Sequence, residues 1–257
     1  MVISMKRNVK FAIMKYIPDF ERDEKINVAV MLHSPEDEFL GTKIIENWRR
    51  LKEFDDELDI DFMKSYLKTV AEEFNYNILI DTKIKINDPL LLEKMTQFYI
   101  NQFSFVISEV NIETNCEEFL TKLKNNYLYY DVEKKKRVSQ KESVEFFGEL
   151  LRGKNITYEL IGGKNCLLGN YNEKINVDLK INDKYYKVIN FNDSNIDTYF
   201  PVIKMWMLNA IELNERKEKL VFVINEQVFD DKINTFVAML SKYGEVIKLS
   251  EFSKYFK

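Results

Sequence analysis

The chain has 257 residues, of which 46% are hydrophobic and 31% are charged. This composition supplies enough apolar surface for one large or two modest folded domains and excludes a disordered chain. Seven glycines and four prolines exclude collagen-like and glycine-rich classes. The formal net charge of -4 at pH 7 disfavours a global basic field for nucleic acid, although a local basic patch remains compatible with it.

The first part of the chain predicts an antiparallel meander. Short runs of apolar and β-branched residues are separated by polar connections, and Ser34-Pro35-Glu36-Asp37 has the composition of a turn. The strands of the meander are predicted over residues 9–17, 26–32 and 39–45.

Helices and one more strand are predicted after the meander. Apolar side chains recur at helical spacing over residues 61–74, which predicts an amphipathic helix with Asp59 or Asp61 as its cap. Two further helices are predicted over residues 89–99 and 117–129, with a strand over 103–110 between them.

The second part of the chain alternates predicted strands and helices. Residues 219–224 form an apolar run of strand length, which indicates a strand buried on both faces and at least one parallel pair. The other strands are predicted over residues 156–161, 175–181, 185–191 and 246–249, and the helices over 143–151, 199–213 and 232–240.

These elements predict an α+β protein with two domains. Residues 1–132 form an N-terminal α+β domain with an antiparallel meander and helices. A charged linker covers residues 133–142, where the composition changes most clearly. Residues 143–257 form a smaller α/β domain with a mixed sheet.

The connection between the first two predicted strands gathers charged and polar side chains. Arg22 can pair with Asp19 or Glu24 through its planar guanidinium, or present that group to an anionic ligand. The group either ties down the connection or forms a binding site, and the sequence leaves both open. The candidate binding residues are Lys15, Tyr16, Asp19, Arg22, Glu24 and Asn27.

Residues 11–30 resemble the opening of a bacterial family of domains of unknown function. The resemblance is carried by an aromatic strand, Tyr16-Ile17-Pro18-Asp19, the pair Arg22 and Glu24, and the strand start Asn27-Val28. Members of that family are often encoded beside HipA-like kinases. The resemblance implies a bacterial accessory or partner role and no established reaction.

Residues 176–192 and the segments after them resemble the core order of PD-(D/E)xK nucleases in a degenerate form. Such nucleases need two carboxylates for Mg²⁺ and a lysine near the attacking water. Asp178 fits the first carboxylate, but Asn190 and Asn192 stand at the other two positions. The pattern therefore favours an inactive scaffold or an unrelated α/β unit, with Lys187 as the lysine of an active alternative.

Other features limit the remaining chemistry. His33 is the only histidine, which excludes a paired-histidine metal site, and the sequence predicts no metal or cofactor. Cys116 and Cys166 fit free thiols in a reducing compartment. The first seven residues lack a signal-peptide core and the longest apolar runs are five or six residues, so we expect a cytoplasmic protein without membrane contact.

A basic run lies in the predicted linker. It is either a solvated linker or a phosphate contact. Its residues are Lys134, Lys135, Lys136 and Arg137.

Together these patterns favour a non-catalytic binding or accessory protein of a bacterial or phage defence, toxin-antitoxin or kinase-linked system, with a protein partner. The alternative is a divergent metal-dependent nuclease or a nucleic-acid-binding protein that uses the C-terminal domain. The sequence favours the absence of enzyme activity without deciding it, and nucleic acid is the less favoured partner.

Overall fold

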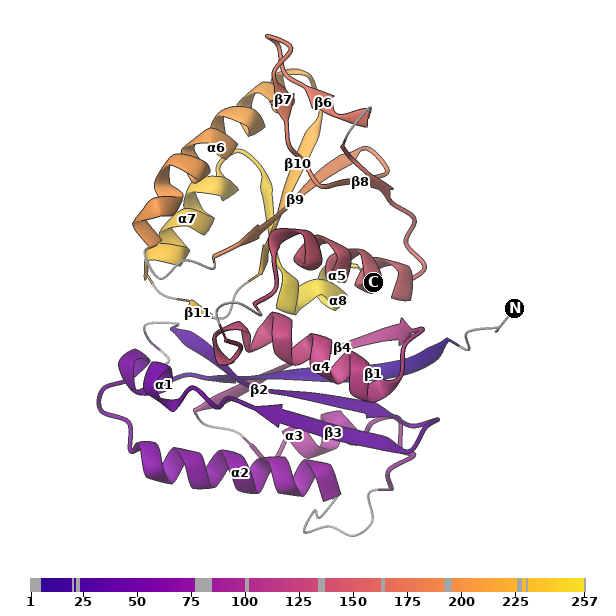
Figure 1. Cartoon of the computed structure of the whole chain (residues 1–257), viewed down its shortest axis with the longest axis vertical. Coiled ribbons are helices and arrows are strands. Elements are labelled where there is room, and N and C mark those ends of the chain that lie inside the picture. Colours follow the sequence, from indigo (N-terminus) through magenta and orange to yellow (C-terminus); the bar gives the residue numbers. More distant parts are fainter. Residues whose placement is uncertain are drawn as a thin grey trace. The chain divides into compact units, whose positions relative to one another are not determined.

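The computed structural model describes residues 6–19, 21, 24–76, 85–99, 102–133, 137–162, 165–191, 196–225, 228–229 and 231–256. Its contacts divide the chain into two compact units, Met1–Val138 with Lys257, and Ser139–Phe256. Both units mix helices and strands (Figure 1). In the described part of the chain, no helix has the length and apolar character needed to cross a membrane.

The N-terminal unit is built on an antiparallel sheet. Strand β2 pairs with β1 and with β3, and β4 pairs with the other edge of β1. The predicted meander is therefore confirmed, and the predicted later strand joins it. The strands are β1 (Arg7–Tyr16), β2 (Lys25–Ser34), β3 (Phe39–Ile44) and β4 (Phe103–Ile112).

Helices cover both faces of this sheet (Figure 1). Helix α4 packs on β2 and β3, whereas α2 and α3 lie on the opposite face. Asp59 caps α2, since its Oδ1 accepts from the backbone N–H groups of Asp61 and Phe62. The helices are α1 (Trp48–Phe54), α2 (Ile60–Tyr76), α3 (Leu91–Thr96), α4 (Cys116–Tyr127) and the 3-10 turn η1 (Tyr129–Asp131).

The C-terminal unit contains a mixed sheet. Strand β10 pairs in parallel with β9 and with β12, while β8 pairs antiparallel with β9 and with β5. Every residue of β10 after Lys219 is buried, as the apolar run predicts. The strands of this sheet are β5 (Glu159–Leu160), β8 (Leu179–Ile181), β9 (Lys184–Asn190), β10 (Lys219–Asn225) and β12 (Glu245–Lys248). Strands β6 (Leu167–Leu168) and β7 (Lys174–Ile175) form a separate two-stranded sheet, and β11 (Val228–Phe229) lies outside the mixed sheet.

Helices lie on both faces of this second sheet (Figure 1). Helices α6 and α7 contribute to one apolar core with β10, and α5 packs on the other face through Phe147 and Tyr186. The helices are α5 (Gln140–Gly153), α6 (Tyr199–Glu215), α7 (Asp231–Ser241), α8 (Phe252–Tyr255), η4 (Ile196–Thr198) and η5 (Leu249–Glu251).

Three predicted elements are shorter or divided. Of the helix predicted over residues 89–99, only Leu91–Thr96 is helical, as α3. Of the strand predicted over residues 156–161, only the two residues of β5 are extended in a sheet. The strand expected over 175–181 is split between β7 and β8, because the N–H of Val177 turns back to the carbonyl of Ile175 at 2.9 Å. That local hydrogen bond replaces a ladder bond with a neighbouring strand.

Candidate functional site

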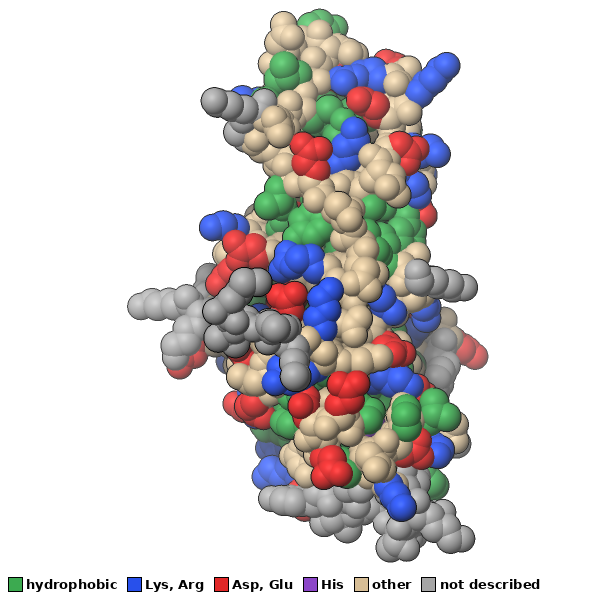
Figure 2. Space-filling model, turned by 90° about the vertical axis from the view of Figure 1, so that its right-hand side faces the viewer, with side chains coloured by type: hydrophobic (Ala, Val, Ile, Leu, Met, Phe, Trp, Pro, Cys, Tyr) green, Lys and Arg blue, Asp and Glu red, His purple; other side chains and the backbone are tan. Residues whose placement is uncertain are grey.

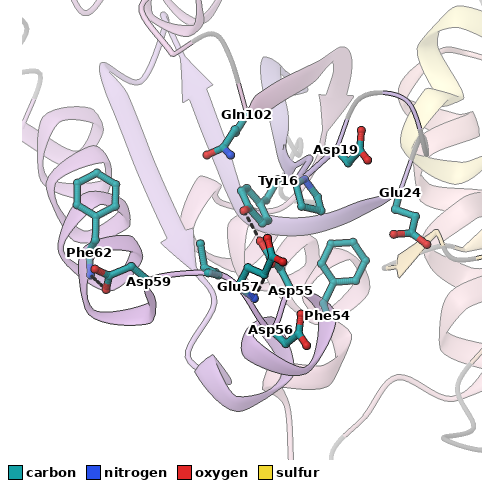
Figure 3. Close-up of a pocket in the computed structure, with 12 residues that line it drawn as sticks. Tyr16, Asp19, Glu24, Phe54, Asp55, Asp56, Glu57, Asp59, Phe62 and Gln102 are labelled. Atoms are coloured by element: carbon teal, nitrogen blue, oxygen red, sulfur yellow. Dashed lines mark hydrogen bonds between the residues drawn. The ribbon is translucent and has the colours of Figure 1, made fainter.

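A pocket of about 510 Å³ opens in the N-terminal unit beside the end of β1 (Figure 3). Its walls come from the connection between β1 and β2, the segment between α1 and α2, and the first turn of α2. The lining residues are Tyr16, Pro18, Asp19, Glu24, Phe54, Asp55, Asp56, Glu57, Leu58, Asp59, Phe62 and Gln102.

The pocket is strongly acidic. Six of these twelve residues are Asp or Glu, and the lining contains no Lys or Arg. Glu24, Asp56 and Glu57 form no ion pair with any residue that the structure describes. The ammonium group of the nearby Lys52 donates hydrogen bonds to two backbone carbonyls, those of Asp56 at 2.5 Å and Leu58 at 2.8 Å. The pocket therefore keeps an excess of negative charge that a cationic ligand would offset.

One carboxylate of the pocket is held in place from the sheet. The hydroxyl of Tyr16 donates to Oδ2 of Asp55 at 2.6 Å, and Oδ1 of Asp55 accepts from the N–H of Glu57 at 3.1 Å (Figure 3). Burial, together with this bond to Asp55, raises the pKa of Tyr16 well above 10.0. Tyr16 is therefore a fixed neutral donor that orients Asp55.

Aromatic rings lead from the interior to the pocket. The ring of Tyr16 lies 5.8 Å from that of Phe103, which stacks on Tyr66 at 5.2 Å. Tyr66 in turn stacks on Phe62 at 6.1 Å, and Phe62 is 64% exposed at the pocket wall. Exposed rings beside carboxylates suit an ammonium or guanidinium group, which gains both cation–π and ionic attraction.

The arrangement does not suit a bound metal ion. Among the described residues, no group of three or more His, Cys, Asp or Glu side chains is placed to hold one. The acidic residues around the pocket act as separate charges spread over its rim.

The structure separates the predicted loop residues. Tyr16, Asp19 and Glu24 line the pocket. Lys15 and Asn27 are buried register partners beyond an irregularity in the β1–β2 ladder, and Nδ2 of Asn27 donates to the carbonyl of Tyr127 at 3.0 Å. Because successive side chains alternate across a strand, Lys15 points to the opposite face of the sheet from Tyr16.

Arg22 lies outside the described residues. The sequence predicted that its guanidinium pairs with Asp19 or Glu24 or binds an anionic ligand, and the structure tests neither prediction. In the structure Oδ1 of Asp19 accepts from the N–H of Glu21 at 2.8 Å, and Glu24 lines the pocket.

The acidic run that extends from the end of α1 to the first turn of α2 was not singled out from the sequence. Six of the nine residues from Glu53 to Asp61 are acidic and none is basic. This run was available as a signal, since such a charge density beside exposed aromatic side chains marks an interaction surface. Its proximity to Tyr16 depends on the folded chain.

The nuclease-like positions of the C-terminal unit do not converge. Oδ1 of Asp178 lies 3.0 Å from Nζ of Lys187, and Oδ2 accepts from the N–H of Val188 at 2.8 Å. Burial raises the pKa of Asp178, and Lys187 opposes that rise. Asn190 instead donates to Oγ of Ser143 at 2.6 Å, and strand alternation puts it on the face opposite Lys187. Asn192 lies outside the described residues.

Only one residue of the basic run, Arg137, lies in the part of the chain that the structure describes. Lys134, Lys135 and Lys136 lie outside the described residues. Arg137 donates to the carbonyl of Val132 at 3.0 Å and lies 5.1 Å from the ring centroid of Tyr129. On the face drawn in Figure 2, Lys and Arg side chains are interspersed with Asp and Glu, so this face shows no continuous basic stripe.

The N-terminal unit is a helix-covered antiparallel sheet that carries an acidic pocket with an exposed aromatic ring. A family model described as a protein of unknown function (DUF3037) matches residues 11–128, a segment that runs from β1 to the end of α4 and contains the pocket. This segment is thus similar to that family of domains. No curated protein and no solved structure matches the chain.

Proposed function

We propose that this protein is a non-catalytic binding protein that acts through protein–protein contact, and that its acidic pocket receives a basic segment of the partner. The observation that carries the proposal is the pocket itself, where Glu24, Asp56 and Glu57 lie without a cationic partner among the described residues beside the exposed ring of Phe62. A lysine or arginine side chain supplies the missing charge and an apolar stem for the ring.

The expected affinity is moderate. Each exposed ion pair contributes about 0.2–1 kcal/mol and each cation–π contact about 0.5–1 kcal/mol, so a segment with two or three cations gains a few kcal/mol. The negative charges around the pocket mainly raise the association rate of a basic segment. This increase in rate falls with ionic strength, because the Debye length shrinks to about 8 Å at 0.15 M.

The resemblance of residues 11–30 suggests where the partner is found. Proteins with that opening are often encoded beside HipA-like kinases, so we place this chain in a bacterial or phage kinase-linked, toxin-antitoxin or defence system. The basic segments of the neighbouring gene products are the first partners to test.

The test measures binding of fluorescent peptides that differ only in charge. An Arg- and Lys-containing peptide should bind the full chain with an affinity that falls as salt rises, and a peptide with Glu in place of each cation should not bind. The double variant Asp56→Lys/Glu57→Lys should weaken binding at least tenfold, because it reverses the charge at two lining residues.

A matched control comes from the same unit. Glu36 is an exposed acidic residue in the turn between β2 and β3, and Glu36→Lys changes the net charge in the same direction outside the pocket. The single variant Asp56→Lys changes the net charge by the same amount as Glu36→Lys. If both variants weaken binding equally, the attraction depends on the net charge of the protein and the proposed site is wrong.

The contact between Asp178 and Lys187 keeps a second candidate, a divergent metal-dependent nuclease or nucleic-acid-binding unit. The pair supplies one carboxylate and one lysine, 3.0 Å apart. Cleavage of DNA or RNA in Mg²⁺ or Mn²⁺ that is lost in Asp178→Asn would favour this candidate. If the unit binds nucleic acid without cleaving it, the affinity for DNA or RNA should fall steeply as the salt concentration rises.

A further inference from the structure

Three aromatic rings form a stacked column that ends at the acidic pocket. The planes of Phe103 and Tyr66 are inclined by 14° with their centroids 5.2 Å apart, and those of Tyr66 and Phe62 by 23° with centroids 6.1 Å apart. Tyr66 covers one face of Phe62. Because Phe62 is nevertheless 64% exposed and lines the pocket, its other face is open. The column therefore ends in a flat, uncovered aromatic face at the pocket wall.

A carboxylate is fixed beside this open ring. Oδ1 of Asp59 accepts from the backbone N–H of Phe62 at 3.0 Å, which holds the carboxylate at the first turn of α2. Oδ2 of Asp59 forms no hydrogen bond with any residue that the structure describes. Side chains three positions apart are neighbours on a helix. Asp59 and Phe62 therefore form one side of the pocket, and Asp55 lies on the other (Figure 3).

The open ring distinguishes two side chains that the charge of the pocket alone does not. Arginine and lysine carry the same positive charge, so the acidic lining attracts both. A guanidinium is planar and weakly hydrated, so it can stack on an aromatic face while its in-plane N–H groups donate to carboxylates. A lysine ammonium is a compact, strongly hydrated charge without a flat face, so it gains less from the same ring.

We propose that this pocket selects arginine over lysine in the segment that it binds, with the guanidinium stacked on the open face of Phe62 beside the carboxylate of Asp59. This proposal rests on the proposed function, because it names the side chain that the acidic pocket receives. Phe62 is then the residue that determines specificity, whereas the carboxylates attract any cation.

Two fluorescent peptides of otherwise identical sequence, one with arginine and one with lysine at every cationic position, test the proposal at one fixed salt concentration. The arginine peptide should bind the full chain at least about fivefold more tightly, through the added stacking and one further hydrogen bond. A third peptide carries citrulline, which has the planar shape of arginine without its charge, and should not bind.

Substitutions at Phe62 test whether the ring makes the selection. Phe62→Leu keeps an apolar side chain but removes the ring, so the arginine and lysine peptides should bind this variant equally. Phe62→Tyr keeps the ring and should keep the preference. Phe98→Leu is the matched control, since Phe98 is 62% exposed in the same unit outside the pocket lining, and should leave the preference unchanged. Circular dichroism confirms that each variant is folded.

The outcomes separate this proposal from the proposed function. If both charged peptides bind equally, if Phe62→Leu keeps the preference, or if Phe98→Leu loses it, the selection of arginine by Phe62 is wrong while the binding of a basic segment stands. If neither charged peptide binds, both proposals are wrong. A citrulline peptide that binds as tightly as the arginine peptide would also overturn both, because the pocket would then recognise planar shape without charge.

Discussion

Replacing Lys187 by Met should destabilise the C-terminal unit by leaving a buried carboxylate without its cation. Both side chains of the Asp178–Lys187 pair are 14% exposed, and Nζ of Lys187 also donates to the carbonyl of Asn176 at 2.9 Å. Breaking a buried pair on one side costs about 3–5 kcal/mol, and we take about 3 because some solvent reaches both groups. For a unit of this size that lowers the melting temperature by about 10 °C.

The pH dependence gives this prediction its sign. The pKa of Asp178 is already raised above 3.8 by burial, and the loss of Lys187 raises it further. A carboxyl with a raised pKa is most favourable to the folded state when it is protonated, so the cost of Lys187→Met should be largest at neutral pH. The cost should shrink as pH falls through the raised pKa.

Calorimetry of the variants between neutral and acidic pH provides the measurement. Lys184→Met is the control on the same strand, because Lys184 pairs with Glu245 while 31% of its side chain is exposed, and such a pair contributes at most about 1 kcal/mol. Asp178→Asn/Lys187→Met should recover part of the loss by removing both charges. Equal melting temperatures for Lys187→Met and Lys184→Met would refute the reasoning.

Three further predictions concern single side chains. Below pH 6.5 the N-terminal unit should lose stability to urea, because burial lowers the pKa of His33 in the folded chain, and His33→Gln should remove this dependence. Tyr16→Phe should lower the free energy of unfolding in urea by about 1.5 kcal/mol through the lost bond to Asp55, and an unchanged value would show that this bond does not stabilise the fold. Gly244→Ala should lower the melting temperature of the C-terminal unit, since a Cβ there would lie 2.9 Å from the carbonyl oxygen of Leu220; an unchanged value would mean that this backbone shifts freely.

Much of the fold is predictable because its strongest elements are encoded locally. The apolar run at 219–224 marks a strand buried on both faces, and the helical spacing at 61–74 marks α2. The failures lie where tertiary contacts decide. Residues 175–181 alternate apolar and polar side chains as a strand does, yet the backbone turns between Ile175 and Val177, and only Leu179–Ile181 pairs with β9.

The pocket was predictable in part. Three of the predicted loop residues, Tyr16, Asp19 and Glu24, line the pocket, because they lie close in sequence at the end of β1 and in the connection that follows it. Asp55 was missed because it meets Tyr16 across 39 residues, and no local pattern encodes that contact. Strand alternation alone could have shown that Lys15 and Tyr16 belong to opposite faces.

The two faces of β1 and β2 therefore contact different parts of the unit: one packs against α4 and the other borders the pocket. On one face Phe11 packs against Phe119 and Tyr127, and Asn27 bonds to the carbonyl of Tyr127, so these residues hold α4 on the sheet. On the other face Tyr16 reaches Asp55 at the pocket. A substitution at Asn27 that weakens binding would act by disturbing α4, whereas exposed carboxylates on the pocket rim contribute no such packing. Loss of binding on changing the rim with unchanged thermal stability can therefore be assigned to the lost charge itself.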